Sequence, residues 1–266
     1  MSGAPLPLAR MPRESRRAIR GVLTDIDDTL TTRGRLTPQA YSALARLKDA
    51  GKLVVPITGR PAGWCDHIAR MWPVDGVVGE NGALWMRYDA SRRKLVRAYA
   101  ASDAERRANR DGLAAVAARV LREVPGTALA SDQPYREADI AIDFCEDVPP
   151  LPRAEVDRIV AIMEAEGLTA KVSSIHVNGW FGRYDKLGMT KRFLADALGI
   201  DLEAERDRFV FAGDSPNDAP MFAYFPNSVG VANVREFLDR IVPPPAWITQ
   251  REAGDGFVEL VDALLE

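Results

Sequence analysis

The strongest constraint on the fold is the regular alternation of short apolar runs with amphipathic helical segments. Three such runs are Gly21 to Ile26, Leu53 to Ile57 and Gly76 to Gly79. After the first, Thr37-Pro38 places a helix N-cap before a proline suited to the first helical position. A second helical segment separates the other two runs. This order of strand, helix, strand, helix, strand predicts right-handed crossovers and a parallel sheet.

This alternation of apolar runs and helical segments stops after residue 83 and resumes at residue 186. The intervening residues predict a hairpin, a long Ala- and Arg-rich helix over Asp103–Glu123, further strands and another helix. We therefore expect an α/β protein whose doubly wound parallel-sheet core comprises residues 21–83 and 186–266. Residues 84–185 are predicted to form an inserted α+β cap.

Residues 1–20 contain several Arg and Pro residues and no apolar block of the kind found in secretory signals. We interpret them as a flexible leader. A transit peptide is the less favoured alternative, because the apolar helical face that such a peptide needs is poorly formed.

Composition excludes several functional classes. A net charge of −3 gives no sign of a general nucleic-acid binder. No apolar run approaches the roughly 18 residues that a membrane span requires. The two cysteines, Cys65 and Cys145, are too few for a disulfide framework. We expect a cytoplasmic protein whose partner is a small molecule, with neither nucleic acid nor membrane as a partner; the sequence predicts no oligomeric state.

The segment Asp25-Ile26-Asp27-Asp28-Thr29-Leu30 is the first that carries chemistry. Because side chains alternate along a strand, Asp25 and Asp27 point the same way. They lie at the carboxyl edge, where open parallel sheets bind ligands. Two adjacent carboxylates repel unless a cation is present, and their oxygens suit Mg²⁺. A solvated acidic turn is the alternative interpretation.

Three further segments place polar groups at the same edge. Thr58, followed by glycine, ends an apolar run and can donate to a phosphate oxygen, although Thr-Gly is also ordinary turn chemistry. Asp214 and Asp218 lie four residues apart after the run Phe209 to Ala212, so one helical turn brings both towards one cation; a plain helix N-cap is the alternative. Lys186 offers an ammonium that offsets carboxylate and phosphate charge, whereas a lone Lys at a helix start is usually solvated.

These segments together resemble the motifs of the haloacid dehalogenase superfamily. The motifs are Asp-x-Asp-x-Thr-Leu at 25–30, Thr-Gly-Arg at 58–60, Lys186, and Gly-Asp-Ser-x-Asn-Asp at 213–218, in the order of that family. The resemblance spans nearly the whole chain after residue 20 and implies a Rossmann-like core. With Gly-Glu-Asn-Gly-Ala at 79–83 and a cap-sized insert, the chain is similar to class IIB. That class includes Cof-type sugar phosphatases, sucrose-phosphate phosphatases and mannosyl-3-phosphoglycerate phosphatases.

The resemblance implies a Mg²⁺-dependent phosphatase that hydrolyses a small phosphorylated metabolite, with a sugar phosphate as the expected substrate. Asp25 is then the nucleophile that forms an aspartyl-phosphate, and Asp27 protonates the leaving oxygen before it activates water. Thr58 and Lys186 hold the transferring phosphoryl group. The implied metal ligands are Asp25, the backbone carbonyl of Asp27, Asp214 and, as a ligand or in support, Asp218.

Two departures from the family pattern bear on the site. Asp28 stands where many members have glycine, and we interpret it as a loop carboxylate that does not catalyse. Lys186 is followed by Leu-Gly where the class often has Gly directly, so Lys191 is a rival for the same role. Lys186 is favoured because it lies at the helix entrance, facing the strand ends.

Substrate choice in this class depends largely on the cap. Ser174, His176 and Asn178 alternate with apolar residues, so one face of a strand is polar. That face either looks onto the site and bonds substrate hydroxyls, or lies in water. The candidate substrate-binding residues are Arg60, Arg136, Ser174, His176 and Asn178.

Three other functions are compatible with parts of this pattern. A phosphomannomutase-like enzyme has a similar fold and motifs, and a requirement for a sugar bisphosphate activator would identify it. A signalling receiver domain is disfavoured because the third run ends in Gly79-Glu80-Asn81, without the aspartate that such a domain phosphorylates. A catalytically silent binding or regulatory protein is expected to lack a motif residue, yet all are present.

Overall fold

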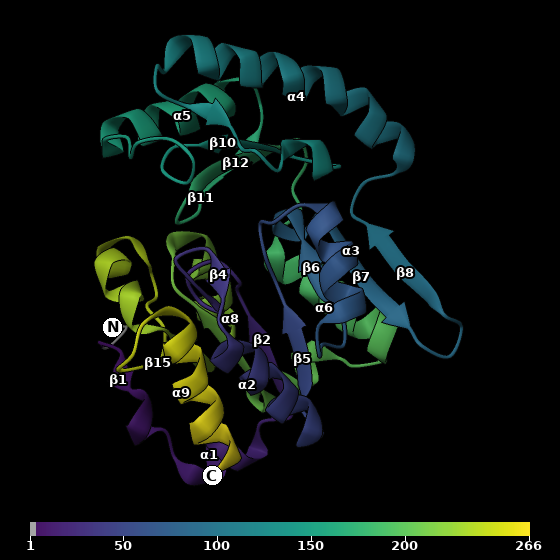
Figure 1. The fold of residues 1–266 in the computed structure, drawn as a ribbon, viewed down its shortest axis with the longest axis vertical. Helices are drawn as coiled ribbons and strands as arrows, with labels where there is room; N and C mark the ends of the chain where they lie inside the picture. Colours follow the sequence, from purple (N-terminus) through teal and green to yellow (C-terminus); the bar gives the residue numbers. More distant parts are fainter. Residues whose placement is uncertain (1–3) are drawn as a thin grey trace.

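The computed structural model describes residues 4–266 and contains a central parallel sheet with a smaller α+β unit stacked above it (Figure 1). The strands of the central sheet run in the order β1-β15-β14-β13-β2-β5, and every neighbouring pair is parallel. Their bounds are Leu6–Pro7, Trp247–Ile248, Asn227–Gly230, Phe209–Gly213, Gly21–Thr24 and Leu53–Pro56. A parallel bridge from Ile57 to Val78 extends the sheet towards β6, Val77–Gly79. The predicted doubly wound α/β core is therefore confirmed.

Alternating side chains of the strands supply two separate apolar clusters, one on each face of the sheet. Val22, Val54 and Val210 pack with helices α2 (Pro38–Asp49), α3 (Ala62–Met71) and α9 (Ala253–Leu265). Leu23 and Phe211 pack with α6 (Lys186–Leu198) and α8 (Ala219–Tyr224) on the opposite face. Strands covered on both faces read as continuous apolar runs, which is the pattern seen in the sequence.

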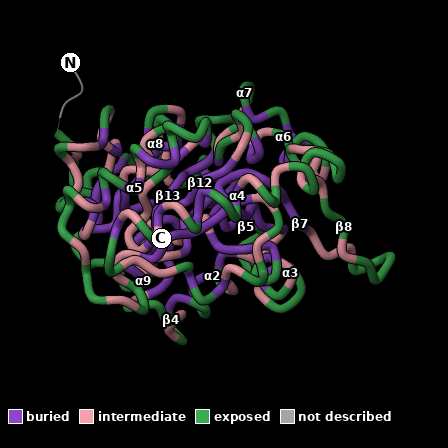
Figure 2. Tube along the Cα trace, turned by 90° about the horizontal axis from the view of Figure 1, so that it is seen from above, coloured by how far each residue is buried: buried purple, intermediate pink, exposed green. Residues whose placement is uncertain are grey.

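The hairpin formed by β7 (Leu84–Asp89) and β8 (Lys94–Tyr99) belongs to this core. It pairs antiparallel with β6, and Leu84 and Met86 join the apolar cluster beneath α3. Only the tip projects from the body of the molecule, as exposed residues (Figure 2). The predicted boundary at residue 84 therefore falls inside the core layer, because a hairpin pattern does not reveal which neighbour it packs against.

The unit above the core is inserted between β8 and α6 and is called the cap below. Helices α4 (Asp103–Glu123) and α5 (Arg153–Ala165) cover one face of a sheet with strand order β11-β12-β10-β9. The strand bounds are Thr169–Val172, His176–Trp180, Ile140–Asp143 and Ala128–Leu129. Ala170 and Val177 face the helices within an apolar cluster of the cap's own. By strand alternation, the residues next to them face the core.

The N-terminal segment corrects the prediction of a flexible leader. Residues 1–3 lie outside the described residues. Leu6 and Pro7 form β1, which pairs with β15, and α1 (Arg13–Ala18) packs against α9. Leu8, Met11 and Ile19 are buried in the core. Three apolar residues separated by Arg and Pro form no periodic pattern, so their burial becomes evident only beside α9.

Several elements are shifted or were not predicted. The sequence pattern favours a helix near residues 234–241 and a final helix from Gly256. In the structure, residues 232–240 form a 3-10 helix and the last helix begins at Ala253. The two-residue strands β15, β3 (Thr31–Thr32) and β4 (Arg35–Leu36) are too short to leave an alternation pattern. Among the helices of residues 4–266, none combines the length and apolar character that crossing a bilayer requires.

Burial of the N-terminal segment predicts a large effect of Leu8→Ala on stability. Leu8 is 1% exposed and Leu6, two residues earlier, is 44% exposed. We expect Leu8→Ala to lower the free energy of unfolding by about 2–5 kcal/mol through the cavity it leaves, and the control Leu6→Ala by less than about 0.5 kcal/mol. Urea denaturation measures both. Equal, small losses in the two variants would show that the segment does not pack on the core.

Candidate active site

Polar residues that follow three core strands meet at the carboxyl edge of the sheet. Asp25 follows β2, Thr58 follows β5 and Asp214 follows β13. The Asp25 amide donates to the carbonyl of Ala212 at 2.9 Å, and the Ile57 amide donates to that of Thr24 at 2.7 Å. The carboxyl ends of parallel strands lie at the same edge of the sheet. The two hydrogen bonds extend the pairing of the strands into the loops that follow them. The predicted site segments are thus brought together.

Lys186 lies between two of the carboxylates. Its Nζ donates to Asp25 Oδ1 at 2.7 Å and to Asp218 Oδ1 at 2.8 Å, and all three side chains are buried. The rival Lys191 lies elsewhere, paired with Glu203 and 4.2 Å above the ring of Tyr224. Of the two lysines, only Lys186 is at the strand ends.

A glycine allows α6 to start this close to the site. Gly82 closes the short helix η2 (Glu80–Gly82) with a φ of +104°. A Cβ atom at this position would lie 2.0 Å from the carbonyl oxygen of Asp185, the N-cap residue of α6. Any other residue would push the helix start, and Lys186 with it, away from Asp25.

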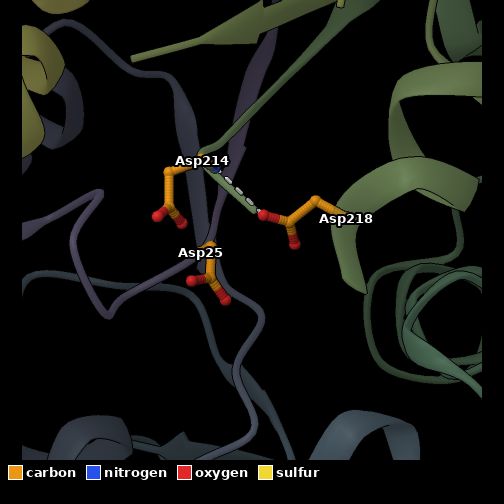
Figure 3. A group of neighbouring side chains, drawn as sticks. All are labelled: Asp25, Asp214 and Asp218. Carbon is orange, nitrogen blue, oxygen red and sulfur yellow. Dashed lines mark hydrogen bonds between the residues drawn. The ribbon is translucent and has the colours of Figure 1, made fainter. Parts of the chain in front are cut away.

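The Asp214–Asp218 loop is closed by its own hydrogen bonds (Figure 3). Asp218 Oδ2 accepts the amide of Asp214 at 3.1 Å and that of Ser215 at 3.4 Å. Asp214 in turn accepts the Thr29 hydroxyl at 3.2 Å and the Asn233 amide at 3.3 Å. Both oxygens of Asp218 are therefore engaged, one by Lys186 and one by the loop, which suits a supporting role beside the cation.

Three buried carboxylates face one ammonium at this point. Oxygens of Asp25, Asp214 and Asp218 all lie within 4.8 Å of one another. Burial raises the pKa of Asp25 to about 8; the attraction of Lys186 opposes this rise, while repulsion from Asp218 and Asp27 adds to it. Burial and repulsion from Asp25, Asp218 and Asp28 also raise the pKa of Asp214 well above its ordinary value. A cluster of hard oxygens short of positive charge fits a Mg²⁺ ion.

Arg60 holds the second acid of the first motif. Its Nε lies 3.0 and 3.1 Å from the two carboxylate oxygens of Asp27, and its Nη2 lies 2.9 Å from Oδ1. The same guanidinium binds two cap residues, Asp132 at 3.2 Å and Glu146 at 2.7 Å. In this arrangement Arg60 orients Asp27 and links the core to the cap. Its contact with substrate stays a prediction.

The polar face of the cap sheet lies over the site and not in water. His176 and Asn178 are buried, and with Ser174 and Arg136 they line a cavity that also contains Asp25 and Asp27. The four cap residues predicted to contact substrate therefore surround the predicted nucleophile. Their role in binding substrate stays a prediction.

Each of these cap side chains already has a charged or polar partner. His176 Nε2 lies 2.8 Å from Glu146 Oε2, and Asn178 Nδ2 donates to Asp139 Oδ2 at 3.0 Å. Partial burial favours the neutral form of Glu146, but hydrogen bonds from His176 and Arg60 outweigh it and lower the pKa of Glu146 to about 2. The partner of Ser174 is Asp28. Burial raises the pKa of Asp28, and the hydrogen bond with Ser174 opposes that rise.

Buried polar contacts, mostly hydrogen bonds, join the cap to the core. Arg136 donates to the carbonyl of Gly59 at 2.8 Å and pairs with Asp132 and Asp139, both at 3.0 Å. Glu80 accepts one core amide, that of Ala62 at 2.9 Å, and two cap amides, those of residues 137 and 138 at 2.8 and 2.7 Å. The cavity above Asp25 has a volume of about 10 Å³, the space of about one water molecule. Entry of a substrate therefore requires the cap to move.

Comparison with known proteins agrees with this geometry. Residues 22–107 match the family of haloacid dehalogenase-like hydrolases. The match covers the segments that carry Asp25 and Thr58, two of the four predicted motifs. A phosphoglycolate phosphatase of Methanoculleus marisnigri is 27% identical over 245 residues, which cover 91% of this chain and 95% of that protein.

Two solved structures share the fold of this chain. One is the Thermoplasma acidophilum protein 0175, with a TM-score of 0.70, 18% identity, and coverage of 93% of this chain and 98% of that one. The other is the sucrose-phosphatase of Synechocystis sp. PCC6803 in complex with sucrose and phosphate, with a TM-score of 0.61, 15% identity, and coverage of 93% and 98%. The predicted fold is confirmed, and the family match over residues 22–107 agrees with the predicted superfamily.

Sequence reasoning missed the partners that position the site. Glu146, Asp132 and Asp139 of the cap neutralise Arg60 and Arg136, and Asn233 binds Asp214. Glu146 lies three residues after the end of β10, so an acid close to a strand end, the signal that singled out Asp25, could have found it. Asp143 fixes its loop by accepting the amides of residues 145, 146 and 147 at 2.8–2.9 Å.

The raised pKa of Asp25 predicts a pH-dependent effect of Mg²⁺ on stability. Without metal, the folded state favours the protonated carboxyl, so the stability that this group contributes is present near pH 4 and is lost as the pH rises towards 8. Metal binding requires the ionised carboxylate and offsets that loss. We expect Mg²⁺ to raise the Tm more at pH 8 than at pH 6 in thermal denaturation, and Asp214→Asn to reduce the effect. An equal shift at both pH values would contradict this linkage.

Proposed function

We propose that this protein is a Mg²⁺-dependent phosphatase that hydrolyses a small phosphorylated metabolite through an aspartyl-phosphate on Asp25. The observation that carries the proposal is the contact of Lys186 with Asp25 and Asp218, buried at the sheet edge beneath a closed cap. A carboxylate, an ammonium and a cation-binding cluster are the groups that phosphoryl transfer needs for in-line placement and charge neutralisation.

Asp25 must be ionised to act as a nucleophile. Burial, together with repulsion from Asp218 and Asp27, keeps its pKa near 8 against the attraction of Lys186, so positive charge has to stabilise the carboxylate. Lys186 supplies part of that charge through its contact with Oδ1. A Mg²⁺ ion held by Asp25, the Asp27 carbonyl and Asp214 would supply the rest and would neutralise the phosphoryl oxygens.

The two steps of the reaction follow from the positions of Asp25 and Asp27. In the first step, a carboxylate oxygen of Asp25 attacks phosphorus, the bond to the leaving oxygen breaks, and Asp27 protonates that oxygen. In the second step, Asp27 takes a proton from water as the water attacks phosphorus, which releases phosphate and restores the Asp25 carboxylate. Arg60 keeps Asp27 oriented, and Thr58 and Lys186 hold the phosphoryl oxygens.

The closed cap favours a small substrate. The buried ties between cap and core exclude bulk water during the reaction and leave no room for a phosphoprotein loop. The name of the Methanoculleus relative puts 2-phosphoglycolate first among the compounds to test. Sugar phosphates, expected from the resemblance to class IIB, come second.

Replacement of the nucleophile tests the proposal. We expect the wild type to release phosphate from a panel of phosphorylated metabolites and from p-nitrophenyl phosphate only with Mg²⁺. Asp25→Asn should lower kcat by about 10⁴-fold or more, because no aspartyl-phosphate can form.

Asp28→Asn is the matched control, since it makes the same chemical change three residues away, at a φ of +52° that Asn also tolerates. It should stay within about threefold of the wild type. Mg²⁺-independent activity, or full activity of Asp25→Asn, would overturn the mechanism, and transfer of phosphate within a sugar bisphosphate would identify a mutase instead.

A further inference from the structure

A second cavity opens beside Lys186, away from Asp27. Its volume is about 270 Å³, and it lies between the cap strands β11 and β12, the connecting segment 181–185, and the core helices η5 (Pro216–Asp218) and α8. It is called the lateral cleft below. Its basic side chains are Lys171, Arg183 and Lys186, and Asn217 lines both this cleft and the cavity above Asp25. The two spaces therefore adjoin.

The cap sheet directs Lys171 towards this cleft. Ala170 and Val172 on β11 pack in the apolar cluster under the cap helices, so Thr169 and Lys171 face the opposite way, towards the core. Lys171 is the direct cross-strand partner of Asn178, which lines the cavity above Asp25. Cross-strand partners lie roughly 5 Å apart at Cβ, so Lys171 lies next to the reaction site.

The lateral cleft carries excess positive charge. Within residues 4–266, neither Lys171 nor Arg183 lies within 4.0 Å of a carboxylate oxygen. Asp185 is the one acid among the residues that line the cleft, and its Oδ1 already accepts the amide of Gly188 at 2.6 Å. Exposed cations that face a concave space attract anions more strongly than cations on a flat surface.

The space above Asp27 has the opposite character. Arg60, Arg136 and His176 are surrounded there by Asp27, Asp132, Asp139 and Glu146, at distances of 2.7–3.2 Å. An additional carboxylate in that space would meet acids that already saturate the available cations. Compared with this space, the lateral cleft is the more favourable place for a second anionic group of the substrate.

We propose that the lateral cleft is a subsite for a carboxylate of the substrate, with Lys171 and Arg183 as the residues that select it. The substrate class is then small phosphorylated carboxylic acids and not neutral sugar phosphates. This inference rests on the proposed phosphatase activity. The phosphoryl group lies at Asp25 and Lys186, and a short acid extends past Asn217 towards the two cations.

The test compares an acidic ester with a neutral one of similar size. The substrates are 2-phosphoglycolate and 2-hydroxyethyl phosphate, and the variants are Lys171→Met, Arg183→Met and the double variant. Each single substitution should lower the ratio of kcat/KM for the acidic over the neutral ester by roughly tenfold, mainly through KM, because one charge-assisted hydrogen bond to the carboxylate is lost. Lys191→Met, which removes a cation paired with Glu203 outside the cleft, should leave the ratio unchanged.

Each outcome separates the subsite from the phosphatase activity. A wild type that favours the neutral ester, or variants that lose activity equally on both esters, would overturn the subsite while phosphatase activity stands. If the wild type hydrolyses neither these esters nor p-nitrophenyl phosphate, the proposed function itself fails. Calorimetric binding of 2-phosphoglycolate to the wild type and the double variant then decides the subsite alone: weaker binding by the variant supports it, and equal binding rejects it.

Discussion

The ammonium of Lys186, buried between two carboxylates, is the interaction on which the rest of the site depends. Asp25, Asp214 and Asp218 come within a few ångströms of one another in an interior that disfavours charge, and Lys186 is the cation that reaches two of them. Removing Lys186 from such a buried set would leave carboxylate charge uncompensated, at a cost of several kcal/mol. The close approach at Gly82, and a Gly213 whose Cβ would lie 2.4 Å from Asp218 Oδ2, both serve to hold these groups together.

The cap is joined to the core by a different kind of contact. The apolar residues of the cap form a cluster of their own under α4 and α5, separate from the two clusters of the core. The contacts at the site are ion pairs and hydrogen bonds with backbone groups: Arg60 pairs with Glu146, Arg136 donates to a carbonyl, and Glu80 accepts from backbone amides. Polar contacts can be exchanged for water as the cap lifts, whereas separating an apolar interface would expose a large apolar surface. The interface thus combines a closed, dry site with a route for opening.

Much of the core and its chemistry could be predicted from local patterns. The strands that carry Asp25, Thr58 and Asp214, and the helix that begins at Lys186, lie where apolar runs and caps place them. The N-terminal segment was misjudged because the burial of Leu8 and Met11 depends on α9, which lies more than 200 residues away in the chain. The alternation of Ser174, His176 and Asn178 predicted a polar strand face, but which way that face points depends on the docking of the cap.

The sequence alone predicted the superfamily, the parallel core and the acids, threonine and lysine at its edge, because each of these can be recognised from a short segment of the chain. The tertiary structure decided the partners of those residues: Arg60 with Asp27, Glu146 with His176, and Lys186 in place of Lys191. It also placed Lys171 and Arg183 around one cleft. The physical reason is that charge pairing and burial depend on distances between segments far apart in the chain, and a one-dimensional pattern does not contain those distances.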